Sequence, residues 1–139
     1  MKKINPLARY HETNEWVLKN NEIAELEKNV FTIGITDFAQ TVFGNVISVS
    51  LPKVGSFIIK GEELAIIESN KSTTEIESPA SGKIISINAE LENSPSWLND
   101  SPYNQGWLVK MELTNLSELE KLMSADEYKN YMSAFYNKI

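Results

Sequence analysis

Residues 61–82 read GEELAIIESNKSTTEIESPASG, and this stretch decides the fold. Two runs that alternate between apolar and polar residues, 64–69 and 73–78, lie on either side of the polar sequence SNKS. Alternation with a period of two is typical of strands, and a short polar connection between two such runs predicts a tight β-hairpin. Lys71 lies at the tip of this hairpin, where we expect its side chain to be fully exposed.

A lysine at a hairpin tip suits a covalent carrier. A carrier needs a primary amine that forms a stable amide on a protruding turn, where a modifying enzyme and later partner enzymes can reach it. The hairpin would fix the root while the attached arm stays mobile, so that one group visits several active sites at high effective concentration. Most tip lysines are merely solvated, and a structural protein in which Lys71 is never modified stays open as an alternative.

Further strand candidates occur on both sides of the hairpin. EWVLK at 15–19 and VFTIGI at 30–35 are rich in β-branched and aromatic residues. Near the hairpin the segments NVISVS, LPKVG, SFIIKG and KIISIN are short and broken by turn residues, and WLVKMEL at 107–113 adds a last strand. Short strands at this density favour a β-sandwich or a barrel.

Helices are expected before and after this β region. Thr36 is a predicted N-cap with Asp37 in the first turn, and about two turns of helix follow before Gly44 ends them. Between residues 116 and 136, apolar side chains recur at spacings of three and four. This period predicts two C-terminal helices that pack on the β core, with Ser124 as the N-cap of the second.

Two segments are predicted to be less regular. Residues 91–106 contain two prolines and many turn formers, so we expect them to cross the surface. Residues 20–29, NNEIAELEKN, are polar, and their pattern does not distinguish helix from loop.

Composition excludes several classes of function. The 139 residues are 42% hydrophobic, which fits a single compact domain over 1–139, and 13 basic against 19 acidic residues give a net charge of -6 that disfavours nucleic acid as a partner. No apolar run approaches the ~20 residues that span a bilayer, and the start lacks the apolar segment of a secretory signal. We therefore expect a cytoplasmic protein without a membrane partner. There is no cysteine, so any thiol chemistry must come from a prosthetic group.

The sequence ESNKSTTEIESPASG at 68–82 resembles the lipoyl-lysine segment of glycine cleavage system H proteins. Further resemblances to that family follow in family order from about residue 10 to residue 131: EWV (15–17), GITDFAQ (34–40), LPKVG (51–55), LNDSPYNQGW (98–107) and SELEKLMSADEY (117–128). Within the lysine segment the matching residues are Glu68, Ser69, Lys71, Glu75, Ile76, Pro79, Ser81 and Gly82.

The resemblance implies a fold, a cofactor and partners. The fold would be mainly β with some α: the flattened β-sandwich (barrel-sandwich hybrid) of lipoyl and biotinyl domains, with a short internal helix and C-terminal helices. Lipoate would be attached covalently to Lys71, as the cofactor of a non-catalytic carrier subunit that has no catalytic residues and no metal. The implied partners are glycine decarboxylase, aminomethyltransferase, dihydrolipoyl dehydrogenase and a lipoate ligase or lipoyl/octanoyl transferase. A carrier that visits several partners is expected to be a monomer.

The chain also departs from the family pattern. Asn14 stands where a histidine usually precedes the Glu-Trp pair, and the lone His11 is expected to be a surface residue rather than a metal ligand. Asn45 replaces an acidic residue, and Asn70 replaces a frequent valine before the lysine. These two changes could alter which partners dock. The polar stretch 20–29 has the character of a local insertion.

Several rival functions are weighed against the carrier of glycine cleavage. Biotin carriers resemble it in fold but have a Met-Lys-Met signature, and the lipoyl domains of 2-oxo acid dehydrogenases have Asp-Lys-Ala and lack the helical tail. An H-like lipoate relay, which passes lipoyl groups to other lipoyl domains, is the nearest alternative, favoured by Asn14 and Asn45. An enzyme that uses Glu68, Glu75 and Glu77 as acid and base is disfavoured, because no nucleophile or basic clamp accompanies them.

Overall fold

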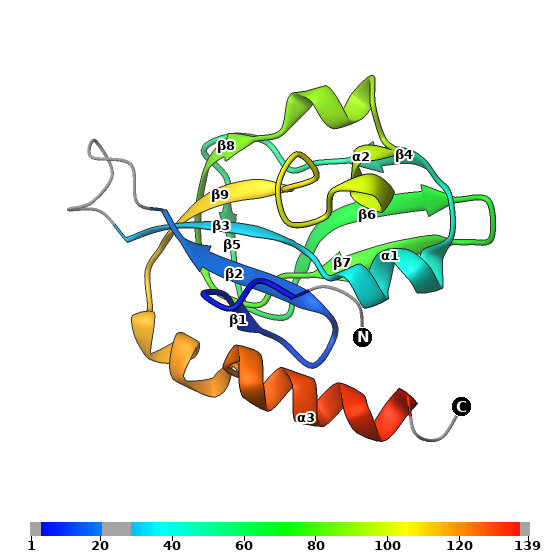
Figure 1. Ribbon diagram of the computed structural model, residues 1–139. Coiled ribbons are helices and arrows are strands. Elements are labelled where there is room, and N and C mark those ends of the chain that lie inside the picture. The colour runs from blue at the N-terminus through cyan, green and yellow to red at the C-terminus, as the bar shows by residue number, and fades with distance from the viewer. Residues whose placement is uncertain (1–3, 21–28, 137–139) are drawn as a thin grey trace.

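Nine strands form two antiparallel sheets within residues 4–20 and 29–136, the part of the chain that the computed structural model describes (Figure 1). The strands are β1 (Arg9–Tyr10), β2 (Glu15–Lys19), β3 (Val30–Ile35), β4 (Val46–Ser50), β5 (Phe57–Ile58), β6 (Glu63–Ser69), β7 (Thr73–Glu77), β8 (Gly82–Ile87) and β9 (Val109–Leu113). The expected flattened sandwich is confirmed, and these two sheets do not close into a barrel.

The larger sheet joins distant parts of the chain. Its six strands lie in the order β1-β2-β3-β9-β8-β5. β9, the last strand, pairs with β3 through Val30↔Glu112 and with β8 through Lys83↔Glu112. A strand from the C-terminal part of the chain therefore lies between the N-terminal strands and the strand that follows the hairpin.

The smaller sheet presents the hairpin. Its order is β4-β6-β7, with β6 in the centre. Leu64 and Ile67 on β6 and Ile76 on β7 are buried, whereas Glu68 and Glu75 are exposed, as the alternation predicted. The apolar face holds this sheet against the larger one, and the hairpin end extends beyond the core.

The main core lies between the sheets. Ile33, Ile84 and Met111 from the larger sheet are fully buried beside Leu64 and Ile67 from the smaller one. Each such side chain contributes about 1.5–3 kcal/mol through burial, which is what fixes the two sheets relative to each other.

Helix α1 (Asp37–Phe43) begins and ends where the sequence predicts. Thr36 Oγ1 accepts a hydrogen bond from the Ala39 amide at 3.2 Å, and the Gly44 amide donates to Gln40 O at 3.1 Å. Gly44 has φ 78°, a left-handed conformation that glycine adopts without strain. The helix lies beside the hairpin end of the smaller sheet (Figure 1).

The expectation that residues 91–106 cross the surface is wrong for part of the segment. A 3₁₀ helix, η2 (Ala89–Glu92), and the short helix α2 (Trp97–Asp100) occur here. Leu91 and Leu98 are fully buried in the main core. The turn formers let the backbone fold tightly, and two apolar side chains then anchor it. The expectation that LPKVG (51–55) forms a strand is also wrong. The segment ends in a turn, in which Gly55 has φ 92°.

The C-terminal tail forms two helices, as predicted, although the first is a 3₁₀ helix. These are η3 (Leu116–Lys121) and α3 (Ala125–Tyr136). Ser124 caps α3, because its Oγ accepts from the Glu127 amide at 3.2 Å. α3 runs along β1 and β2 (Figure 1), and its Tyr128 stacks on Tyr10 in a second apolar cluster. The ambiguous segment 20–29 lies almost wholly outside the described residues.

Candidate functional site

The predicted hairpin is present, with Lys71 in its turn. β6 and β7 pair antiparallel up to Glu68↔Thr73, and the Ser69 amide donates to Ser72 O at 2.8 Å across the turn. Lys71 is exposed at the tip. The period-two pattern of two short runs was sufficient to place this residue.

Ser69 holds the turn from within. Its Oγ accepts from the backbone amides of Lys71 and Ser72, each at 3.2 Å, and lies 3.3 Å from Ser72 O, to which it donates. Ser69 is buried, with an exposed fraction of 7% for the residue. A serine that bonds to amides two and three residues ahead fixes the backbone of the lysine without using the lysine side chain.

The Lys71 amine is free to react. No carboxylate oxygen of the described residues lies within 4.0 Å of Lys71 Nζ. The aliphatic stem runs past Gly44: a Cβ built on that glycine would lie 3.2 Å from Lys71 Cε and 3.4 Å from Cδ. An exposed primary amine on a fixed turn fits the attachment of an acyl group by an amide bond.

Two departures from the family pattern turn out to contact each other. The Asn70 amide donates to Asn45 O at 2.9 Å, and the Asn45 amide donates back to Asn70 Oδ1 at 3.1 Å. The tip of the hairpin is thereby joined to the connection between α1 and β4. Residues 45 and 70 are 25 positions apart, so no local pattern indicates that these two changes contact each other.

Asn99 supports the same connection, a role that the sequence pattern does not predict. Its Nδ2 donates to Gly44 O at 2.7 Å and to Gln40 Oε1 at 3.1 Å, and its Oδ1 accepts from the Val46 amide at 2.9 Å. It belongs to the run LNDSPYNQGW that marks the resemblance, but nothing in that run indicates its partners.

The carboxylates weighed as an acid-base pair lie along the hairpin. Glu68 Oε1 accepts from Ser48 Oγ at 3.0 Å, and Glu75 lies one diagonal step away on the neighbouring strand. Glu77 lies opposite Glu63, farther from the tip. This row of acids follows one face of the hairpin strands and gives that face a negative charge.

His11 and Asn14 have structural partners. His11 is half-buried at the surface: 14% of its side chain is exposed, and its Nδ1 lies 3.4 Å from Glu15 Oε1 and 2.5 Å from Thr13 Oγ1. Asn14 has φ 74°, and its Oδ1 accepts from Tyr128 OH at 2.6 Å. In the described residues, no group of three or more histidine, cysteine, aspartate or glutamate side chains forms a metal site.

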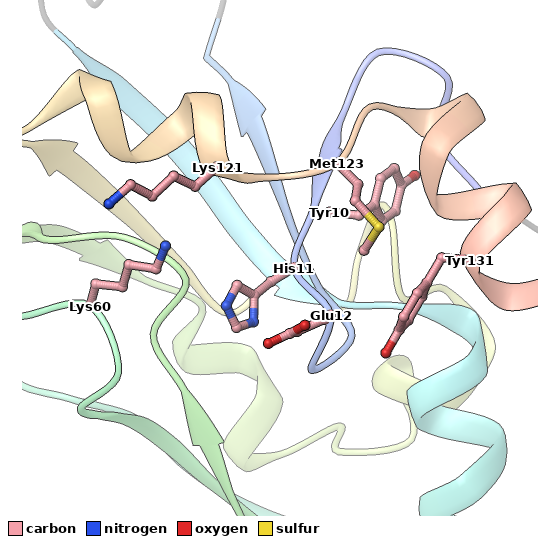
Figure 2. Close-up of a pocket in the computed structure, with 7 residues that line it drawn as sticks. All are labelled: Tyr10, His11, Glu12, Lys60, Lys121, Met123 and Tyr131. Carbon is pink, nitrogen blue, oxygen red and sulfur yellow. The ribbon is translucent and has the colours of Figure 1, made fainter.

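A hollow of about 240 Å³ lies beside His11, and it is separate from the hairpin tip. Its lining residues are Tyr10, His11, Glu12, Lys60, Lys121, Met123 and Tyr131. Figure 2 shows Lys60 and Lys121 pointing into the same space from different elements. Lys60 precedes β6 and Lys71 follows it, and the seven residues of this strand span roughly 20 Å. The hollow is therefore at the opposite end of β6.

Comparisons with known proteins agree on one family. The family model described as "Glycine cleavage H-protein" matches residues 8–135. The glycine cleavage system H protein of Coprothermobacter proteolyticus is 45% identical over 124 residues, which cover 89% of this chain and 93% of that protein. The mitochondrial glycine cleavage system H protein 2 of Arabidopsis thaliana is 42% identical over 123 residues, covering 88% of this chain and 74% of that protein.

A solved structure has the same fold. The crystal structure of a glycine cleavage system H protein from Mycobacterium marinum superposes with a TM-score of 0.82 at 29% sequence identity, covering 94% of this chain and 99% of that one. Among the described residues, no helix is both long enough and apolar enough to cross a membrane.

Proposed function

The chain belongs to the glycine cleavage H-protein family, and from this premise we propose that it is the lipoyl-carrying shuttle of a glycine cleavage system, with the lipoyl arm on Lys71. Members of this family are lipoyl-bearing carrier subunits, which supports a non-catalytic role for this chain. The finer proposal is that the protein carries the aminomethyl group of glycine from glycine decarboxylase to aminomethyltransferase, acting as one domain over residues 1–139.

One observation carries the choice of Lys71. Its amine is exposed at the tip of a turn whose backbone is held by Ser69 and by Asn70, and in the described part of the chain no carboxylate pairs with it. When attached, the lipoyl group supplies a disulfide that can be reduced to a dithiol, which is chemistry that a chain without cysteine does not have. Ser69 and Asn70 hold the backbone to which the arm would be attached. The row of acids gives partner enzymes a surface to recognise.

The proposed partners follow from the proposed transfer of the aminomethyl group on the lipoyl arm. They are glycine decarboxylase, aminomethyltransferase, dihydrolipoyl dehydrogenase for reoxidation of the arm, and a lipoate ligase or lipoyl/octanoyl transferase for its attachment. We propose that the protein meets them as a monomer in the cytoplasm, a location that the bacterial relatives support.

The relay alternative is less well supported. It was favoured by Asn14 and Asn45, two departures from the family pattern. Asn14 bonds to Tyr128, and Asn45 bonds through its backbone to Asn70. The Asn14 side chain is thus occupied within the protein, whereas the Asn45 side chain is exposed, so only the argument from Asn14 loses weight.

The first test is modification of Lys71. We expect the chain, co-expressed with a lipoate ligase and supplied with lipoate, to gain one lipoyl-amide increment in its intact mass, and Lys71→Arg to gain none. Lys53→Arg is the matched control, because Lys53 is also an exposed lysine at a turn. An unmodified wild type beside a modified known H protein, or a modified Lys71→Arg, would contradict the proposal.

The second test separates the shuttle from the relay. The lipoylated protein is incubated with glycine decarboxylase, aminomethyltransferase and labelled glycine, and separately with an unmodified lipoyl domain and a lipoyl transferase. Release of the label from glycine only when the lipoylated protein is present supports the shuttle. Transfer of the lipoyl group without label release supports the relay.

A further inference from the structure

The tip of the hairpin does not project freely from the sheet. It rests on the connection between α1 and β4, which we call the tip seat and define as Gly44 and Asn45. Two hydrogen bonds join Asn70 to Asn45: the Asn70 amide donates to Asn45 O at 2.9 Å, and Asn70 Oδ1 accepts from the Asn45 amide at 3.1 Å. The first uses backbone atoms alone, whereas the second requires an acceptor on side chain 70.

Gly44 leaves the space in which the tip sits. A Cβ at this position would lie 2.8 Å from Asn70 Oδ1 and 3.2 Å from Lys71 Cε. The side chains of Asn70 and Lys71 therefore share the surface of one glycine. Because the lysine stem lies over that surface, the direction in which Lys71 leaves the hairpin depends on how firmly the tip is held there.

The seat is itself held from the other side. Asn99 Nδ2 donates to Gly44 O at 2.7 Å, and Asn99 Oδ1 accepts from the Val46 amide at 2.9 Å. Asn99 belongs to α2, and Leu98 of the same helix is fully buried in the core. The seat is a fixed base, so a bond between it and residue 70 transmits that rigidity to the tip.

We propose that Asn70 is a positioning residue for the Lys71 arm: its side-chain oxygen binds the tip seat and so holds the lysine stem across Gly44, in the orientation that a lipoylating enzyme meets. This inference rests on the proposed function only in taking Lys71 as the modified residue. The bond between Asn70 and Asn45 is a property of the protein before any modification.

The test compares Asn70→Leu with Asn70→Asp. Leucine has nearly the shape of asparagine but no acceptor, whereas aspartate keeps an oxygen at the same place. We expect Asn70→Leu to speed hydrogen exchange at the Asn45 amide about fivefold, the size of one net hydrogen bond. The KM of a purified lipoate ligase for the Asn70→Leu variant should rise by about the same factor, while kcat stays within about twofold. The variant loses only the orientation that the lysine stem has before it meets the ligase. Asn70→Asp should restore both values toward wild type.

Asn45→Asp is the control for charge. It adds the same negative charge beside the tip but leaves the bond intact, because Asn45 contributes backbone atoms to it. It should therefore match wild type in both measurements.

Three results would overturn the inference: an Asn45 amide equally protected in Asn70→Leu and wild type, an unchanged KM, or an equal rise in KM for Asn45→Asp. If wild type itself were not lipoylated, the carrier proposal would fail, and the exchange comparison on the unmodified protein would still decide whether Asn70 holds the tip.

Discussion

At the scale of single residues, Asn99 illustrates how one amide organises a junction that no local pattern indicates. It satisfies the Gly44 carbonyl, the Val46 amide and the Gln40 side chain, which belong to the end of α1 and the start of β4. These groups are next to the hairpin tip. A buried backbone group without a partner is costly, so this side chain should matter more than its partial exposure suggests.

We predict that Asn99→Ala lowers the free energy of unfolding by about 2 kcal/mol, because the Val46 amide and the Gly44 carbonyl lose the partner that the structure gives them. Urea unfolding at unchanged m-value measures the loss. Asn104→Ala is the control, since Asn104 is exposed and no side-chain hydrogen bond of it is found in the described residues. Equal stability of the two variants would contradict the role of Asn99.

At the scale of elements, α3 depends on a reciprocal cap. The Ser124 amide donates to Glu127 Oε1 at 2.8 Å, and the Glu127 amide donates to Ser124 Oγ at 3.2 Å. The first of these bonds, with help from the Ser124 side chain, lowers the pKa of Glu127. Because the folded pKa lies below the unfolded one, the part of the cap that depends on the ionised Glu127 carboxylate is complete above the usual glutamate pKa and is lost as the pH falls through the folded pKa.

We predict that Ser124→Ala destabilises the protein by about 1 kcal/mol at neutral pH, the usual value of an N-cap side chain. Thermal unfolding followed by circular dichroism measures the change. Ser133→Ala, on the exposed part of the same helix, is the control. A melting temperature for Ser124→Ala no lower than that of Ser133→Ala would show that the cap is not needed.

At the scale of the whole molecule, a second apolar cluster attaches the tail to the sandwich. Tyr10 on β1 stacks on Tyr128 of α3 with ring centroids 4.5 Å apart, and Tyr128 OH donates to Asn14 Oδ1. Trp16 belongs to the same cluster, and its Nε1 donates to Pro102 O at 3.1 Å. The chain start, the loop after α2 and the C-terminal helix thus meet in one place, away from the lysine hairpin.

This cluster predicts sensitivity to alkali. Burial raises the pKa of Tyr10 from 10.0 to about 12, and burial also raises the pKa of Tyr103, which packs against the same cluster. The folded protein therefore keeps a proton that the unfolded chain releases, so stability is complete below pH 10.0 and falls as the pH rises toward about 12.

The expected slope is about 1.4 kcal/mol per pH unit for each such tyrosine. Urea unfolding of wild type and Tyr10→Phe across this range isolates the contribution of Tyr10, because phenylalanine has no proton to lose. The variant should be less stable at neutral pH, since it loses the bonds to Asn5, yet its stability should fall less steeply in alkali. Parallel slopes would exclude this linkage.

The sequence by itself determined the elements that depend on near neighbours. Period-two alternation placed β6 and β7 and put Lys71 in the turn between them. Thr36, Gly44 and Ser124 marked helix ends correctly, because a cap bonds to groups within a few residues. The flattened sandwich followed from the density of short strands together with the family resemblance.

Only the tertiary structure decided which residues meet across long separations. Asn70 with Asn45, Asn99 with Gly44 and Tyr128 with Asn14 join positions that no spacing relates. Burial of Leu91 and Leu98 was missed for the same reason, since a polar segment gives no sign of which of its few apolar side chains will find a space in the core. Local patterns report the backbone preferences of a segment, whereas these contacts depend on packing and on hydrogen-bond partners that exist only once both sheets and the tail are in place.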